Sequence, residues 1–284
     1  MYERYYGLTE KPFSLTPDPR FLYLSAAHRD ALAYLTYGLS DGKGFLVVVG
    51  EAGTGKTTLA RAVVERLQER VSLSFVLTTK VSMKQLLILA MHDLGIRTRG
   101  LDKAGLLIAF NEFLLEKLQQ GRQVVLIVDE AQNLSRTVLE ELRMLSNLET
   151  SREKLLQIVL LGQPELLTML ESQDLRQLRQ RVPGIARLQP LPPEDVGPYL
   201  ENRLRVAGNS RVRVAPGTGA DVHRYTGGIP RLINMIADRM LLLGYVDAKD
   251  ELDHALVLEA WRELGRVGPS PEPAPSPSPP AGVA

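Results

Sequence analysis

The amino-acid sequence predicts an α/β fold in which helices cover both faces of a parallel β-sheet, followed by a smaller helical domain. Three features of the sequence carry this prediction. Short runs of valine, leucine and isoleucine lack polar alternation, as expected of strands that are buried on both faces. Segments with the apolar spacing of helices lie between these runs, and only helical patterns remain after Pro193. Strands that alternate with helices favour a parallel sheet that binds ligands at the carboxyl ends of its strands.

The predicted elements follow one another along the chain. The first is a helix over residues 25–40, in which apolar side chains from Ala31 to Leu39 share one face. Buried strands are predicted at residues 45–49, 73–77, 124–128 and 155–161. The helices among them are predicted at residues 57–69, 82–93, 102–119 and 135–148, and Ser82 and Gln85 are spaced as a capping box. Further helices are predicted at residues 194–206, 217–225, 230–246 and 253–264.

These elements divide the chain into two domains and a tail. We expect an α/β domain over residues 1–190, in which residues 1–43 form an N-terminal loop and helix, and a helical domain over residues 191–264. At 284 residues and 44% hydrophobic content, the chain can bury a substantial core. Residues 265–284 have a different composition, because seven of the eighteen prolines follow Gly268. We expect this segment to be a disordered tail or linker.

Composition and charge exclude several kinds of function. The sequence contains no cysteine, which excludes disulfides, thiolate metal sites and cysteine nucleophiles. Its net charge is only +1, so no overall field attracts nucleic acid or an anionic membrane, although local basic patches stay open. No signal-peptide core is found at the N-terminus, and no apolar run approaches the length of about 18 residues that spans a bilayer. We expect a soluble, cytoplasmic protein without a transmembrane segment.

A glycine-rich loop follows the first predicted strand. Its sequence, GEAGTGKT at residues 50–57, matches G-x-x-x-x-G-K-[ST] between a strand and a helix. Glycines let the backbone bring its N–H groups against phosphate oxygens, and the helix adds the positive end of its dipole. Lys56 is expected to reach the β and γ phosphates, and Thr57 to ligate Mg²⁺. A simple glycine turn is the alternative. The predicted nucleotide contacts are Gly50, Glu51, Ala52, Gly53, Thr54, Gly55, Lys56, Thr57 and Thr58.

Two carboxylates end a later strand, in the sequence VVLIVDEAQ at residues 124–132. Asp129 can hold Mg²⁺ through water, and Glu130 can orient and deprotonate an attacking water. The alternative is that both residues only cap the next helix. Together with the glycine-rich loop, the pair predicts hydrolysis of ATP, because a protein that only binds nucleotide has no use for Glu130.

Five further motifs follow one another along the chain: KPFSLTPDPRFLYLS, VDEAQNLS, LEELRMLSNLET, LLGQPEL and GGIPRLIN. Because of these motifs and their order, residues 1–264 resemble the AAA+ ATPases. They resemble more closely the general secretion pathway protein A (ExeA-like) group, including soluble ATPases linked to exosortase and exopolysaccharide systems. The resemblance implies the P-loop NTPase (AAA+) fold with a helical lid, ATP and Mg²⁺ as cofactors, and hydrolysis of ATP to ADP and phosphate.

The same resemblance implies roles for polar residues outside the loop. Gln163 matches a sensor that helps to position the attacking water, although Gln-Pro also readily begins a helix. Arg231 in GGIPR matches a second sensor that touches the γ phosphate from the helical domain. Arg176, Arg179 and Arg181 lie where this family places an arginine that enters the neighbouring subunit's site.

An arginine that enters a neighbour's site implies a ring-shaped oligomer. The alternative is that these arginines only form a basic, solvated helix face. The site of the adenine base stays open. Phe21 or Tyr23 would stack on it if the segment before the loop folded over the base, whereas such residues more often belong to the core.

The job of the ATPase depends on its partner. Long members of the family continue into a membrane span and a cell-wall-binding domain, whereas this sequence ends in the proline-rich segment. We therefore expect an ATPase, free in the cytoplasm or peripheral at the inner membrane, that acts on a protein partner in envelope secretion or polysaccharide export.

Two other functions stay open at this point. One is a transposition regulator that assembles on DNA, with phosphates held by Arg203, Arg205, Arg211 and Arg213. The other is a nucleotide-dependent switch with negligible turnover.

Overall fold

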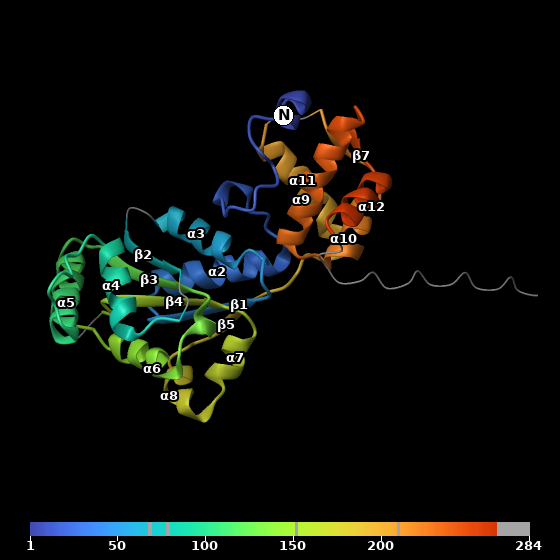
Figure 1. Cartoon of the computed structure of the whole chain (residues 1–284). Coiled ribbons are helices and arrows are strands. Elements are labelled where there is room, and N and C mark those ends of the chain that lie inside the picture. The colour runs from blue at the N-terminus through green and yellow to red at the C-terminus, as the bar shows by residue number, and fades with distance from the viewer. Residues whose placement is uncertain (68–69, 78–79, 151–152, 209–210, 266–284) are drawn as a thin grey trace, which may run out of the picture. The chain divides into compact units, whose positions relative to one another are not determined.

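The computed structural model describes residues 1–67, 70–77, 80–150, 153–208 and 211–265. The end of the helix predicted at 57–69 and the tail predicted beyond residue 265 lie outside the described residues. The described residues form two compact units (Figure 1), one within residues 16–189 and one that combines residues 1–15 with described residues between 190 and 265. Each unit is described by itself. Within the described ranges, no helix combines the length and the apolar character needed to cross a bilayer.

The α/β unit is built on a five-stranded parallel sheet with the strand order β2-β3-β4-β1-β5. The strands are β1 (Phe45–Gly50), β2 (Val71–Leu77), β3 (Gln123–Asp129), β4 (Leu156–Gly162) and β5 (Ile185–Leu188). The first four confirm the predicted strands. The edge strand β5 was not predicted, because it has four residues, of which only Leu188 is buried and Arg187 is exposed.

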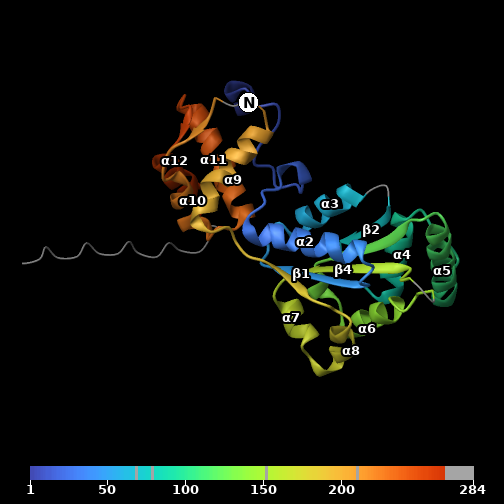
Figure 2. The same ribbon diagram turned by 180° about the vertical axis from the view of Figure 1, so that it is seen from behind.

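Helices cover both faces of this sheet, as the sequence predicts (Figure 2). They are α2 (Ala26–Ser40), α3 (Lys56–Leu67), α4 (Met83–Asp93), α5 (Lys103–Gln119), α6 (Arg136–Leu145), α7 (Glu165–Leu170) and α8 (Arg176–Gln180). Three short 3₁₀ turns are η1 (Pro19–Phe21), η2 (Ala131–Asn133) and η3 (Gln173–Leu175). The predicted capping box is present at α4, where Ser82 and Gln85 exchange hydrogen bonds.

The strand residues alternate between two cores. Phe45, Val47 and Val49 of β1 pack into one core with α4, α5 and α6, whereas Leu46 and Val48 pack into the other with α2 and α3. Burial on both faces explains why these strands show no polar alternation. Because β4 lies between β1 and β3 and all three are parallel, their carboxyl ends meet at one edge of the sheet.

The second unit is mainly helical. It contains α1 (Tyr2–Tyr6), α9 (Pro193–Val206), α10 (Thr218–Thr226), α11 (Pro230–Val246) and α12 (His254–Glu263), together with a two-stranded pair of β6 (Arg213–Val214) and β7 (Glu251–Leu252). The four helices from α9 to α12 confirm the predicted ones, while α1 and the short strands were not predicted.

Residues 1–15 pack in this helical unit, which differs from their predicted place in the α/β domain. The hydroxyl of Tyr2 donates to the carboxylate of Asp238, and that of Tyr6 donates to the carbonyl of Lys249 at 3.0 Å. Both tyrosines are buried. The aromatic N-terminus thus supplies core side chains to the helical unit, which its short and irregular apolar spacing did not reveal.

Candidate functional site

The glycine-rich loop connects β1 to α3. Gly53 and Gly55 have φ angles of 83° and 97°, in the left-handed region that glycine adopts without strain. Gly50 is needed for another reason, since a Cβ there would lie 2.5 Å from the carbonyl oxygen of Leu188 on β5. The unpredicted strand β5 therefore packs against the start of the loop. The predicted contact residues from Gly50 to Thr58 occupy this loop and the first turn of α3.

Lys56 is the first residue of α3 and is buried. Its Nζ atom donates to the carbonyl oxygens of Gly50 at 2.8 Å and Glu51 at 3.0 Å. Burial lowers the pKa of Lys56, and the neighbouring carboxylates of Glu130 and Asp129 act in the opposite direction. A positive charge is thus held inside the loop at a cost, which suits a group that awaits an anion.

Thr57 and Asp129 bring two oxygen ligands together. The hydroxyl of Thr57 donates to Oδ2 of Asp129 at 2.5 Å, and Oδ1 of Asp129 accepts the N–H of Glu130 at 2.9 Å. Asp129 is buried at the end of β3. Hydroxyl and carboxylate oxygens are the hard ligands that Mg²⁺ takes beside phosphate, so these two residues fit the ion that the predicted chemistry requires.

Glu130 follows β3 in a strained conformation. Its φ angle is 52°, which is uncommon for a residue with a side chain and is often found at functional sites. Oε2 of Glu130 accepts hydrogen bonds from Nε2 of Gln132 at 2.6 Å and from Nε2 of Gln163 at 3.2 Å. Its side chain makes no capping hydrogen bond at η2, which counts against the capping alternative. The carboxylate is instead held by two amides.

Gln132 was not predicted as a site residue. Besides contacting Glu130, this residue accepts the backbone N–H of Gln163 through Oε1 at 3.1 Å, so it links the ends of β3 and β4. Its place two residues after Glu130 in VDEAQ was an available signal, because side chains that follow a parallel strand gather at the same edge. Its contact with Gln163 could not be predicted without knowing that β3 and β4 are neighbours.

Residues 39–170 match the family model of an AAA domain. The chain contains an AAA domain. Over 258 residues it is also 43% identical to general secretion pathway protein A of Aeromonas hydrophila, a match that covers 89% of this chain and 47% of that protein. The chain thus spans about half the length of this relative. The predicted resemblance is confirmed, and the AAA domain implies nucleotide binding and suggests ATPase activity.

Solved structures share the fold of this AAA protein. They include ORC2 of Aeropyrum pernix, determined as ADPNP–ADP complexes, with a TM-score of 0.69 and 18% identity over 89% of this chain and 71% of that one. Cdc6p of Pyrobaculum aerophilum has a TM-score of 0.71 and 17% identity, covering 89% and 70% of the two chains. The Thermotoga maritima RuvB branch migration motor has a TM-score of 0.59 and 18% identity, covering 92% and 75%. At such identities the comparison shows the fold alone.

The arginines predicted for this site are all exposed. Arg176, Arg179 and Arg181 are exposed in and after α8, and Nη1 of Arg179 donates to the carbonyl of Val182 at 3.1 Å. Arg231 is exposed in the first turn of α11, in the helical unit. The AAA domain thus holds the loop, the carboxylates and Gln163 together, while the roles of the arginines stay predictions.

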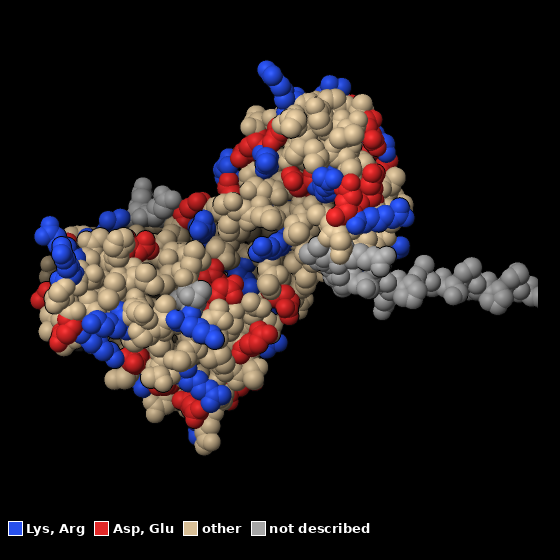
Figure 3. Space-filling view, viewed as in Figure 1, with Lys and Arg blue, Asp and Glu red and all other residues tan. Residues whose placement is uncertain are grey.

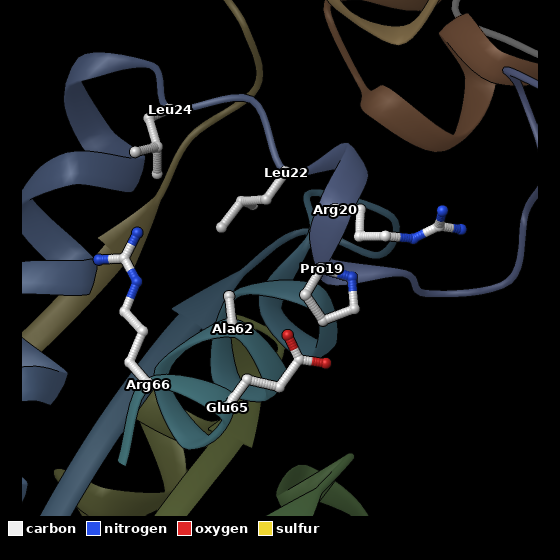
Figure 4. Close-up of a pocket in the computed structure, with 7 residues that line it drawn as sticks. All are labelled: Pro19, Arg20, Leu22, Leu24, Ala62, Glu65 and Arg66. Atoms are coloured by element: carbon white, nitrogen blue, oxygen red, sulfur yellow. The ribbon is translucent and has the colours of Figure 1, made fainter. Parts of the chain in front are cut away.

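In the segment before the loop, the position of Phe21 favours a role in the core over stacking on the adenine base. This side chain is buried, with the guanidinium of Arg20 5.5 Å from its ring centroid. Beside it is a cavity of about 280 Å³ between the η1 segment and α3 (Figure 4). The residues that line it are Pro19, Arg20, Leu22, Leu24, Ala62, Glu65 and Arg66. None of them belongs to the predicted phosphate site, so the cavity has no part in the phosphate chemistry.

Proposed function

We propose that the protein binds Mg²⁺–ATP at the glycine-rich loop and hydrolyses it to ADP and phosphate. One observation carries this proposal. Glu130 lies at the end of β3 in a left-handed conformation, with its carboxylate held by the amides of Gln132 and Gln163. A carboxylate held in this way beside the glycine-rich loop is suited to orient an attacking water and to take its proton.

Each side chain of the group has a distinct task. Lys56 exchanges its carbonyl partners for oxygens of the β and γ phosphates, a stronger interaction for an ammonium group. Thr57 and Asp129 hold Mg²⁺, which when bound neutralises the charge on the phosphates. Glu130 takes a proton from water as the water oxygen bonds to the γ phosphorus and the bond to the bridging oxygen of ADP breaks. Gln163 keeps the Glu130 carboxylate directed at that water.

The arginines complete the site in an oligomer. We place Arg231 on the γ phosphate from the helical unit, where it would couple movement of that unit to the state of the nucleotide. An arginine of α8 would enter the site of a neighbouring copy in a ring, where such a residue contributes roughly 10³ to 10⁵ in rate. Arg181 suits this task better than Arg179, whose guanidinium already donates to the carbonyl of Val182.

The partner that would respond to hydrolysis is a protein of envelope secretion or exopolysaccharide export. The 43% identity to general secretion pathway protein A supports this choice. The protein would act in the cytoplasm or at the periphery of the inner membrane, and release of phosphate would move its helical unit.

Assembly on DNA is less well supported. Arg203, one of the four arginines considered for it, is buried and donates to the backbone carbonyls of Pro12 and Ser14, and Arg211 pairs with Asp250. On the face shown in Figure 3, acidic and basic side chains are interspersed rather than gathered into one basic field. DNA binding without base contacts depends on such a field.

Steady-state release of phosphate tests the proposal. Glu130→Gln should retain ATP binding and lower the rate by roughly 10² to 10⁴. The wild-type rate per molecule should rise with protein concentration, because a neighbour's arginine is needed, and DNA should not change it. Equal and negligible release by wild type and Glu130→Gln would instead identify a nucleotide switch. A rate that stays low until DNA is added would favour the transposition-type function.

A further inference from the structure

A buried histidine contacts the glycine-rich loop from the side of α2. His28 lies in the first turn of this helix and is 3% exposed. Its Nε2 atom is 3.0 Å from the carbonyl oxygen of Thr54, and its Nδ1 atom is 2.7 Å from the hydroxyl of Ser25, the N-cap of α2. The imidazole therefore joins the start of a helix to the middle of the loop.

The partners of His28 define its tautomer. A carbonyl oxygen can only accept, so the proton is on Nε2, which donates to Thr54. In the neutral imidazole Nδ1 then accepts the hydroxyl proton of Ser25, whose oxygen also accepts the backbone N–H of His28 at 3.4 Å. Ser25 thus orients the ring and selects the tautomer that can donate to the loop.

The bond to Thr54 fixes a peptide group that faces the phosphate site. In a trans peptide the carbonyl of Thr54 and the N–H of Gly55 point in opposite directions. Because His28 holds this carbonyl toward α2, the N–H of Gly55 points away from α2. The other hydrogen bonds of Thr54 are local, since its N–H and its hydroxyl both donate to the carbonyl of Glu51. They do not restrain the peptide that follows it.

The imidazole of His28 also lies close to Gly55. Gly55 has a φ of 97°, and a Cβ on it would lie 3.3 Å from Nε2 of His28. The imidazole is therefore packed directly against the glycine. A rotation of the Thr54–Gly55 peptide would break the bond to His28 and leave a buried donor without its acceptor, which is unfavourable.

We propose that His28 is a positioning residue for nucleotide binding, which holds the Thr54–Gly55 peptide so that the N–H of Gly55 donates to the diphosphate. The role rests on the proposed function, because it requires a phosphate in the loop. His28 itself does not touch the nucleotide. It acts by keeping one donor of the loop in place before the anion arrives, which reduces the free-energy cost of ordering the loop on binding.

The test compares three variants of the full chain by their affinity for ADP, measured with a fluorescent ADP analogue, and by their thermal unfolding midpoint without nucleotide. His28→Ala should weaken ADP binding about tenfold, the equivalent of about 1.4 kcal/mol. His28→Gln should recover most of that loss, because its amide carries an N–H donor near the position of Nε2. In ATP hydrolysis, His28→Ala should raise KM while kcat changes much less.

Tyr34→Phe is the matched control. Tyr34 is also on α2, and its hydroxyl donates to the carbonyl of Gly184 at 2.6 Å and accepts the N–H of Val47 at 3.4 Å, so its loss removes buried hydrogen bonds of α2 that do not involve the glycine-rich loop. This variant should lose stability and keep the ADP affinity of wild type. ADP affinity that is unchanged in His28→Ala, or as weak in His28→Gln as in His28→Ala, would overturn the positioning role and leave the proposed function standing. A wild-type protein that binds no ADP would overturn both.

Discussion

Lys56 and Arg203 are both buried cations, at 5% and 7% exposure, yet their surroundings differ. Lys56 lies in the glycine-rich loop, donates to two carbonyls of that loop and has the carboxylates of Asp129 and Glu130 nearby. Arg203 lies on α9 of the helical unit, where it makes hydrogen bonds to neutral acceptors. It donates to the carbonyls of Pro12 and Ser14 and to the hydroxyl of Tyr199.

Burial of a charged side chain does not by itself mark a functional site. Burying a cation is costly in both places. These partners of Arg203 belong to the N-terminal segment (residues 1–15) and to α9, so the bonds hold parts of one unit together. The partners of Lys56 belong to its own loop, and holding the loop to itself gains little. The cost of burying Lys56 is therefore better explained by a ligand than by stability.

The largest expected effect separates these two roles. Lys56→Ala should weaken ATP and ADP binding by roughly 10²-fold, because the charge-assisted hydrogen bonds to phosphate are lost. Its thermal unfolding midpoint without nucleotide should stay the same or rise, since a desolvated ammonium is removed. Calorimetric titration and thermal melts measure both quantities. The exposed Lys84 of α4 provides the control, and a Lys56→Ala protein that binds ADP normally would contradict the comparison.

Arg203→Ala should have the opposite outcome. It leaves the carbonyls of Pro12 and Ser14 and the hydroxyl of Tyr199 without a donor, and we expect a loss of about 2–3 kcal/mol in the unfolding free energy of the helical unit. The affinity for ADP should change little, provided that the measurement is made well below the unfolding transition.

The matched control for this loss is Arg205→Ala, on the same helix. Arg205 donates to the side chain of Asn202 in an exposed contact, so its removal should be almost neutral. Denaturant unfolding followed by circular dichroism would rank the variants. Equal stability of Arg203→Ala and Arg205→Ala would show that the bonds to the N-terminal segment contribute nothing.

A smaller effect is expected at Gln132, which acts on the site through Glu130. Gln132→Ala removes the shorter of the two bonds to this carboxylate, and kcat should fall about tenfold, within the range of general base catalysis. ATP affinity should be retained, because Gln132 has no predicted contact with the phosphates. The exposed Asn133 is the matched control. If KM rose and kcat stayed unchanged, Gln132 would serve binding rather than the orientation of Glu130.

The same contrast shows what could be predicted from the sequence. Lys56, Thr57, Asp129 and Glu130 follow apolar strands in short contiguous motifs, so their meeting at one sheet edge was predictable. Gln132 and His28 each have a hydrogen-bond partner remote in sequence, Gln163 and Thr54, which only the fold brings near. The docking of residues 1–15 in the helical unit depends on contacts with residues beyond 190, and no local pattern announces such contacts.

The smallest effect concerns the N-terminal segment at high pH. Burial, with smaller contributions from Tyr5 and Asp250, raises the pKa of Tyr6 to about 12, from an ordinary value of 10.0. The unfolded chain therefore loses this proton more readily than the folded one, so stability from Tyr6 is complete below pH 10 and is lost as the pH rises toward 12. Tyr6→Phe should lower stability by about 1 kcal/mol at neutral pH, through the lost bond to Lys249.

That variant should also show a shallower loss of stability between pH 10 and 12 than wild type, which unfolding in urea at several pH values would measure. Tyr2 contributes in the same direction, because burial and its bond to Asp238 also raise its pKa, so the difference between wild type and Tyr6→Phe isolates Tyr6. If residues 1–15 docked only weakly, Tyr6 would titrate like a free tyrosine and the two curves would be parallel. ADP affinity should be equal in both proteins at neutral pH, because Tyr6 stabilises the helical unit and the glycine-rich loop belongs to the other unit.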